Sequence, residues 1–141
     1  MIQRIQTVWL LLAAIASFLI TRIPLFVGKA TGMPDRFYLA TESLPLFILA
    51  VVPGIIAVLA IFLFKNRKKQ LRFCLVGMFT SLPFLFWQMQ KISDFIKVNS
   101  LTTASYYWGA ILPLAVFTFF IFAIRNIRKD EKLIKSLDRL R

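Results

Sequence analysis

Four long apolar runs, separated by short polar segments, dominate the pattern of residues along the chain. They cover about residues 5–27, 44–64, 71–90 and 106–124. Each run has close to the roughly 20 residues that an α-helix needs to cross the hydrocarbon core of a bilayer. The pattern predicts an all-α fold, a four-helix transmembrane bundle with a cytoplasmic amphipathic C-terminal helix, in one integral-membrane domain over residues 1–141.

A signal peptide is the main alternative for the first run, because Arg4 precedes it. Signal sequences have an apolar region of roughly 7–15 residues that ends at a cleavage site of small residues. Here the run is longer and continues into Thr21, Arg22, Ile23 and Pro24. We therefore expect a retained membrane anchor.

The two segments between spans on the far side from the N-terminus are short. Residues 28–43 have a turn signature followed by an aromatic pair, Phe37 and Tyr38, which favours a turn and then a segment resting on the membrane surface. Residues 97–105 are polar and predict a simple loop. Lys91 and Asp94 are spaced for an ion pair, and Arg22 is placed to reach lipid headgroups.

Composition supports a membrane environment, since 59% of the 141 residues are hydrophobic and only 17% are charged. Soluble domains have roughly 45–50% apolar residues. The net charge is +12, and the charges gather at the ends of the apolar runs. With the N-terminus inside, thirteen Lys and Arg residues are cytoplasmic and five are outside. The positive-inside rule then predicts that both termini are cytoplasmic.

The C-terminal segment, residues 125–141, has the clearest polar pattern. Steps of three and four residues place five cations along one helical face: Arg125, Arg128, Lys132, Lys135 and Arg139. Another face carries Leu133, Ile134, Leu137 and Leu140. The pattern predicts a helix that continues out of the last run, and one interpretation is that it lies on or near the anionic inner leaflet. The other is a docking element whose leucines enter a groove of a partner, while the cations face lipid, an acidic protein surface or RNA phosphates.

Small residues at four-residue spacing indicate positions where helices pack closely. The candidate pairs are Ala13 with Ser17, Ala50 with Gly54, and Ser105 with Gly109. Prolines within three of the runs predict kinks at Pro53, Pro83 and Pro113. Thr80 and Ser81 are placed to bond the carbonyl that Pro83 frees, and no such group is evident in the sequence near Pro53.

Candidate chemistry is sparse. The chain has one cysteine, Cys74, and no histidine, so we expect no disulfide, no metal site and no cofactor. The middles of the four runs contain no ionisable residue, which disfavours an ion-coupled transporter. Gln88 and Gln90 could line a polar vestibule or join helices by hydrogen bonds. No catalytic motif is present, so we expect no enzyme; an enzyme acting on lipid would lack a visible nucleophile and base.

The two ends of the chain carry a resemblance. The opening residues 1–6, Tyr107-Trp108-Gly109 before the last run, and the closing residues 130–141 resemble the four-span membrane family known as domain of unknown function 4293, found in Bacteroidetes. The resemblance covers essentially the whole chain. It implies a multi-pass protein of a bacterial inner membrane and brings no established activity. Because the matching ends both fall on the predicted cytoplasmic side, a contact site there is a hypothesis that follows.

The leading functional hypothesis is a non-enzymatic accessory subunit of a larger inner-membrane complex. Such a subunit would dock through its transmembrane faces and its basic cytoplasmic side, and a protein translocation, insertion or secretion assembly would suit it. The alternative is a small channel or transporter for an apolar or uncharged solute, working through the proline kinks and the Gln88/Gln90 region. A continuous polar cavity would favour that alternative, and a solid apolar interior would argue against it.

Overall fold

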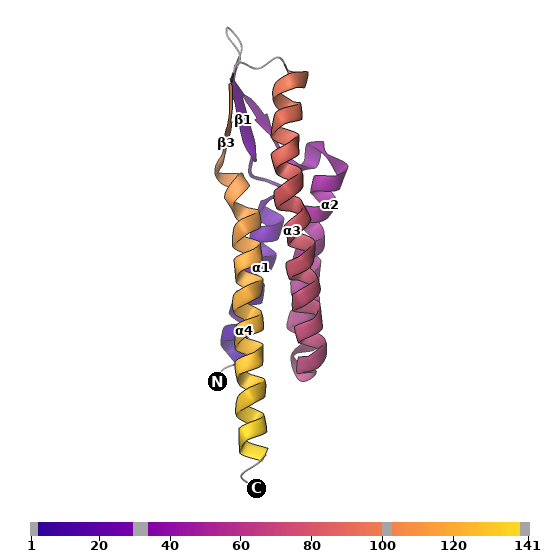
Figure 1. Cartoon of the computed structure of the whole chain (residues 1–141), viewed down its shortest axis with the longest axis vertical. Helices are drawn as coiled ribbons and strands as arrows, with labels where there is room; N and C mark the ends of the chain where they lie inside the picture. The colour runs from indigo at the N-terminus through magenta and orange to yellow at the C-terminus, as the bar shows by residue number, and fades with distance from the viewer. Residues whose placement is uncertain (1–2, 30–33, 100–102, 139–141) are drawn as a thin grey trace.

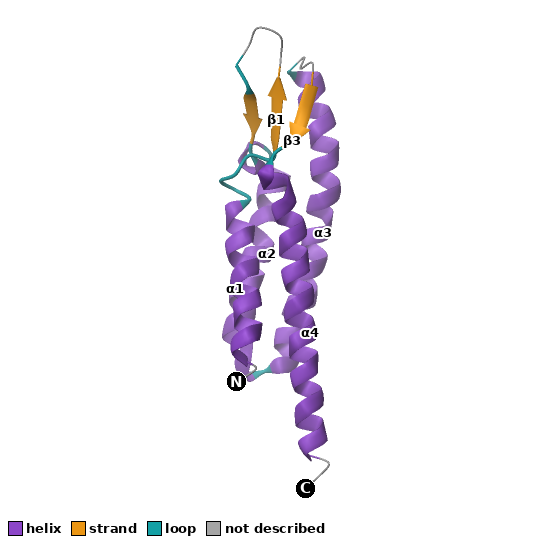
Figure 2. Ribbon diagram, turned by 90° about the vertical axis from the view of Figure 1, so that its left-hand side faces the viewer, coloured by secondary structure: helices purple, strands orange, loops and turns teal. Residues whose placement is uncertain are grey.

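The computed structural model of the protein describes residues 3–29, 34–99 and 103–138. Four helices run side by side, and a small sheet lies at one end of the bundle (Figures 1 and 2). The helices are α1 (Gln3–Leu19), α2 (Leu44–Phe62), α3 (Arg67–Val98) and α4 (Leu112–Asp138). The strands are β1 (Phe26–Lys29), β2 (Arg36–Tyr38) and β3 (Thr103–Tyr106), and the short 3-10 turns are η1 (Ala40–Glu42), η2 (Leu63–Lys65) and η3 (Trp108–Ile111). The predicted four-helix bundle is confirmed.

The two ends of the bundle differ. We call the end with the strands the sheet end, and the opposite end the tail end. The described parts of both termini lie at the tail end, where α4 also continues past the other three helices (Figures 1 and 2). Three helical segments are long and apolar enough to cross a membrane, Leu44–Lys65, Arg67–Val98 and Trp108–Ile134, and the apolar part of α1, Ile5–Leu19, is shorter.

Each helix packs against two neighbours, so that α1 contacts α2 and α4, and α3 contacts the same two helices. The buried positions follow steps of three and four residues, the spacing of a left-handed coiled-coil seam. On α1 and its last turn they are Gln6, Leu10, Ala13, Ser17 and Ile20, and on α4 they are Val116, Phe120, Ala123, Ile127 and Asp130. On α2 and α3 they include Leu46, Ala50, Pro53, Ala57 and Ala60, and Gln70, Cys74, Gly77, Ser81, Phe84 and Gln88.

Small residues fill much of the interior, and large apolar residues cover much of the outside. Leu11, Ile48 and Phe79 are examples of the outer set, each about half exposed or more. Such an arrangement suits a hydrocarbon solvent, where large apolar surfaces cost nothing and close backbone approach stabilises the bundle. Gly77 shows how close the approach is, because a Cβ there would lie 2.4 Å from the Phe120 ring on α4.

The first helix is shorter than the apolar run that predicts it. The Thr21 hydroxyl donates to the Phe18 carbonyl at 2.7 Å as the helix ends in a turn. Pro24 cannot continue a helical hydrogen-bond ladder. The prediction of helix up to residue 27 is therefore wrong, since residues from Phe26 onward form a strand.

The sequence analysis does not predict the three-stranded antiparallel sheet. Its strand order is β2-β1-β3, with Phe26 of the central strand paired to Tyr38 and to Tyr106. The Phe26 ring lies 5.7 Å from Tyr38, and Tyr38 lies 5.2 Å from Phe95 of α3. The predicted surface segment at Phe37 and Tyr38 is thus a strand, and the predicted loop over residues 97–105 ends in one.

The third and fourth helices extend beyond the predicted spans. With 32 residues, α3 is about 48 Å long, well over the roughly 30 Å hydrocarbon core, and its upper turns run beside the sheet (Figure 1). The predicted pair of Lys91 and Asp94 lies on this extension, 3.4 Å apart. The helix that continues into the C-terminal segment agrees with the prediction, because α4 extends without a break to Asp138.

The prolines occupy two kinds of position. Pro53 and Pro83 lie inside α2 and α3. Pro113 is the second residue of α4, so it starts a helix and does not kink one, which corrects that prediction. Near Pro53, the Ser17 hydroxyl of α1 donates to the Ala50 carbonyl at 2.5 Å, a contact that the sequence analysis did not find.

The hydroxyls near Pro83 bond different carbonyls from the expected one. The carbonyl that this proline frees, four residues earlier, belongs to Phe79. Thr80 donates to the Gly77 carbonyl at 2.9 Å and Ser81 to the Met78 carbonyl at 2.7 Å. The two side chains therefore serve the preceding carbonyls of the same turn.

Candidate interaction surface at the tail end

A buried polar pair joins the two ends of the chain at the tail end of the bundle. The Gln6 amide on α1 donates from Nε2 to Oδ2 of Asp130 on α4, and the two side chains are 3% and 5% exposed. Both residues continue the apolar seams, one step beyond Leu10 on α1 and one step beyond Ile127 on α4. The opening and closing motifs that carry the family resemblance therefore meet in space.

Other polar groups are buried at the same end. Gln70, near the start of α3, is 2% exposed and is the first buried position of the α3 seam. Two polar atoms here, Oδ1 of Asp130 and Nη1 of Arg67, are buried and have no hydrogen-bond partner within the described part of the chain. Leaving a buried polar atom unpaired costs about 1–3 kcal/mol, so this end has hydrogen-bonding capacity left over.

The predicted contact residues that the structure describes lie on the last turns of α4, and those after Asp130 lie on its protruding part. Arg125, Arg128 and Lys132 are exposed, and Leu133 and Ile134 are 43% and 41% exposed. Arg125 and Arg128 precede Asp130, where α1 still packs on α4, and no other described helix continues alongside α4 beyond that turn (Figures 1 and 2). Arg139 and Leu140 lie outside the described residues, as do the side chains of Lys135 and Leu137.

Sequence reasoning placed Asp130 among the polar residues of the tail and did not predict its burial. The available signal was the spacing of the α4 seam. Stepping by three and four from Val116 through Phe120, Ala123 and Ile127 arrives at Asp130. The same steps from Ala13 back through Leu10 arrive at Gln6. The spacing therefore places Gln6 and Asp130 at the ends of the two buried seams.

The predicted packing pairs divide into two groups. The structure brings Ser17, Ala50 and Gly54 together, with a Cβ at Gly54 falling 3.1 Å from Cβ of Ser17, and Ala13 is buried on the same α1 seam. Ser105 and Gly109 share no helix, which corrects the third pair. Ser105 is an exposed residue of β3.

Gly109 has a different structural role from the predicted one. Its N–H donates to the Pro24 carbonyl at 3.2 Å, and a Cβ at this position would lie 2.3 Å from that same oxygen. Only glycine allows this approach of η3 to the turn after α1. The residue thereby fixes the sheet end to the start of α4.

A cavity inside the bundle, among its described residues, is small. A cavity between Ser17, Pro53, Ser81 and Phe84 has a volume of about 10 Å³, close to the minimum that holds one water molecule. Gln88 is buried and its Nε2 lies 3.5 Å from the Ala110 carbonyl, while its Oε1 has no partner among the described residues. Gln90 is exposed, so the two glutamines do not share one face.

These features define a class: a small four-helix bundle in which three helical segments are long and apolar enough to cross a membrane, with one helix projecting from its end. The family model described as a domain of unknown function (DUF4293) matches residues 2–140, and the chain belongs to that family. The resemblance found in the terminal motifs is thereby confirmed. No curated protein and no solved structure matches the chain.

Proposed function

We propose that the protein is a non-enzymatic accessory subunit of a larger inner-membrane complex, to which it docks through its transmembrane faces and its basic tail end. The observation that carries this proposal is the projecting end of α4. Exposed Leu133 and Ile134 lie there beside exposed Lys132, on turns of α4 that no other part of the described chain covers, and exposed Arg128 lies one turn before them. An apolar strip flanked by cations suits an apolar groove with an acidic rim on a partner protein.

The buried polar pair supports this proposal by holding the projecting helix in place. Because Gln6 fixes Asp130 against α1, the turn that follows Asp130 starts from a defined position. A helix that is already ordered loses less conformational entropy on binding than a flexible tail does. The unpaired atoms Oδ1 of Asp130 and Nη1 of Arg67 add hydrogen-bonding capacity that a docked partner could use.

A test of docking is copurification of the tagged full-length protein in mild detergent, with a photo-reactive amino acid at Ser136 or, as a control, at Asp94. We expect a stoichiometric partner that cross-links from position 136 and not from position 94. The double variant Leu133→Ser/Ile134→Ser should reduce its recovery about tenfold or more, because each buried aliphatic side chain contributes about 1.5–3 kcal/mol. Recovery of the wild type only as a monomer or self-oligomer would contradict the proposal.

The matched control for charge is a pair of substitutions at each end. Arg128→Gln/Lys132→Gln removes two cations from the tail end, and Lys29→Gln/Lys97→Gln removes two from the sheet end. We expect only the first pair to weaken the complex and to reduce its salt sensitivity. Equal effects from both pairs would indicate attraction to net charge, without a docking surface.

The proposal also requires that the tail end face the cytoplasm. The distribution of thirteen Lys and Arg residues toward the tail end against five toward the sheet end supports that orientation. Single cysteines at Ser136 or Asp35, in a Cys74→Ala background, provide the test. A membrane-impermeant thiol reagent added outside intact spheroplasts should label position 35 and leave position 136 unlabelled; the reverse would overturn the cytoplasmic docking site.

A further inference from the structure

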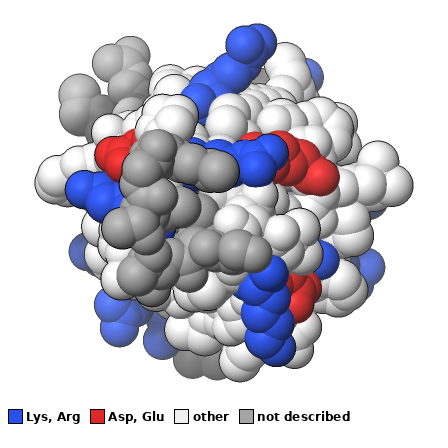
Figure 3. Space-filling view, turned by 90° about the horizontal axis from the view of Figure 1, so that it is seen from above, with Lys and Arg blue, Asp and Glu red and all other residues white. Residues whose placement is uncertain are grey.

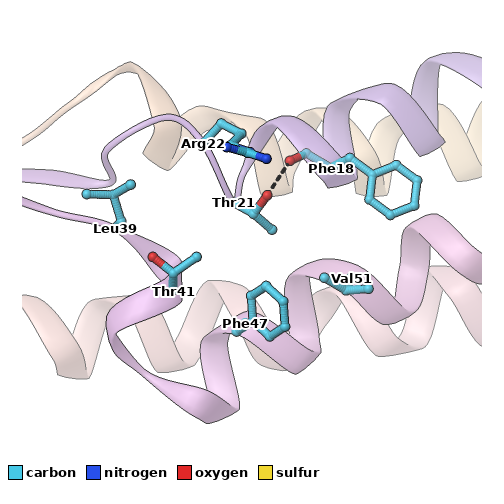
Figure 4. Close-up of a pocket in the computed structure, with 7 residues that line it drawn as sticks. All are labelled: Phe18, Thr21, Arg22, Leu39, Thr41, Phe47 and Val51. Atoms are coloured by element: carbon cyan, nitrogen blue, oxygen red, sulfur yellow. Dashed lines mark hydrogen bonds between the residues drawn. The ribbon is translucent and has the colours of Figure 1, made fainter.

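A second feature lies at the sheet end, apart from the tail-end surface. A pocket of about 560 Å³ opens between the sheet-side ends of α1 and α2 (Figure 4). Phe18 forms part of its wall on the α1 side, and Phe47 and Val51 form part of its wall on α2. Phe18 and Phe47 are 43% and 39% exposed, so this wall continues onto the outer apolar surface of the bundle.

The other part of the pocket is polar. Thr21 and Arg22 follow the end of α1, and Thr41 belongs to η1 (Figure 4). The Thr21 hydroxyl donates to the Phe18 carbonyl, so its oxygen is left to accept. Arg22 is the charged member of the lining and makes no ion pair within the part of the chain that the structure describes.

Glu42, the acidic residue next to Thr41 in the sequence, does not line this pocket. Glu42 adjoins Thr41 on η1, and its Oε1 accepts a hydrogen bond from the Leu39 N–H at 3.2 Å. This contact ties the carboxylate to the backbone of its own turn. The pocket therefore presents a guanidinium and hydroxyl groups together with Leu39 at one side, and aromatic and aliphatic surface at the other.

We propose that this pocket binds one phospholipid of the leaflet at the sheet end, through its phosphate group and the upper part of an acyl chain. A guanidinium offers two parallel N–H donors to a phosphate, and the volume falls within the roughly 300–1,000 Å³ of ligand pockets. The pocket lies where the two apolar helices end, which is the depth at which lipid phosphates meet acyl chains. Charge and apolar surface are thus arranged in the order in which a phospholipid carries them.

The apolar wall is the reason for choosing a lipid over a free phosphate. Phe18, Phe47 and Val51 would offer nothing to a small anion, and the polar side is open to water. An acyl chain that lies along them contacts the same apolar surface that the other lipid chains contact. Phosphate recognition by Arg22 would then separate this site from ordinary contact with surrounding lipid.

The test is native mass spectrometry of the full-length protein released from nanodiscs of phosphatidylglycerol and phosphatidylethanolamine. Two variants change the pocket: Arg22→Gln removes the guanidinium, and Val51→Trp fills the apolar side. Arg36→Gln is the matched control, because Arg36 has the same charge, lies on β2 at the same end, and bonds Asn99 outside the pocket. Helix content by circular dichroism and elution in detergent confirm that each variant is folded.

We expect wild type and Arg36→Gln to retain one phospholipid per chain. Each pocket variant should reduce that fraction about tenfold, Arg22→Gln by the loss of roughly one charge-assisted hydrogen bond and Val51→Trp by occupying the space of the acyl chain. Equal retention by all four proteins would overturn the site. Equal retention of diacylglycerol, which has no phosphate, would overturn recognition of the headgroup. Displacement of the lipid by millimolar inorganic phosphate would overturn the lipid assignment in favour of a small-anion site.

Discussion

The sheet end and the tail end of this bundle solve the problem of ending four helices in opposite ways. At the sheet end, strands and aromatic rings close over the helices, and Figure 3 shows acidic and basic side chains mixed on that face. The segments there carry five Lys or Arg and three Asp or Glu residues, whereas those at the tail end carry thirteen and three. The tail end has no sheet among its described residues, and a single helix projects from it.

This difference shows how the two ends pack. At the sheet end, the Tyr38 ring packs between Phe26 and Phe95. Burial raises the pKa of its phenol above the ordinary value of 10.0. At the tail end, Asp130 and Arg67 each keep a buried atom unpaired within the described chain. Gln88 keeps one such atom nearer the sheet end, so the tail end is distinguished mainly by the projecting turns of α4. Four measurements would break or sharpen this contrast.

The largest effect is expected from Gly109→Ala at the sheet end. The new methyl group would lie 2.3 Å from the Pro24 carbonyl oxygen, which is backbone and cannot move aside alone. We expect a loss of about 3 kcal/mol in the free energy of unfolding, measured by thermal denaturation in detergent. Ser105→Ala, at an exposed strand position four residues earlier, is the control and should change the free energy of unfolding little. Equal losses from both variants would instead favour the predicted packing of Ser105 and Gly109 on one helix face.

The polar pair at the tail end gives the next largest effect. Asp130→Leu leaves the buried Gln6 amide without its acceptor, which should cost about 2 kcal/mol. The double variant Gln6→Leu/Asp130→Leu replaces both partners by apolar groups and should recover most of that loss. A double-mutant cycle measures the coupling. Strictly additive effects would mean that the contact does not join the two ends of the chain.

Alkaline titration should loosen the sheet end before the tail end. Burial raises the pKa of Tyr38, a hydrogen bond with Ser43 opposes this by a smaller amount, and the carboxylates of Glu42 and Asp94 raise it further. Since the folded pKa is the higher one, the contribution of Tyr38 to stability is fully present below about pH 10 and is lost as the pH rises through the folded pKa. Tyrosinate absorbance of wild type against Tyr38→Phe measures this, and a Tyr38 midpoint at or below 10 would contradict it.

The smallest effect is expected from Lys91→Ala. Its ion pair with Asp94 spans 3.4 Å, but the two side chains are 32% and 58% exposed. Exposed pairs contribute about 0–1 kcal/mol, so the melting temperature should hardly change. A loss as large as that of Asp130→Leu would show that the extension of α3 depends on charge more than on Phe95 packing.

The sequence predicts the helices far better than it predicts the sheet. Long apolar runs mark α2, α3 and α4 because hydrocarbon demands continuous apolar surface, and the terminal motifs identify the family. The strands are three or four residues long, and Phe26 pairs with Tyr106 across eighty positions, so no local pattern announces them. The predicted first span extends too far, to Val27, because the apolar run continues into β1 and apolar residues occur in strands as well as in helices.

The candidate surface was predictable in part. Alternating steps of three and four residues place Arg128 and Lys132 on the outside of α4, and the structure agrees on their exposure. The same steps lead the buried seam to Asp130, but a charged residue next to a basic tail looks like surface until Gln6 is found opposite it. Such a contact between distant segments depends on how the four helices pack.

Unequal helix lengths have a consequence for the surrounding lipid. With 17 residues, α1 reaches about 26 Å, slightly less than the roughly 30 Å hydrocarbon core, whereas α3 exceeds it by far. A crossing by α1 would place a short apolar segment, Ile5–Leu19, on one side of the protein, and a short segment is accommodated by local thinning of the bilayer. We expect the protein to deform membranes asymmetrically and to prefer bilayers of shorter acyl chains.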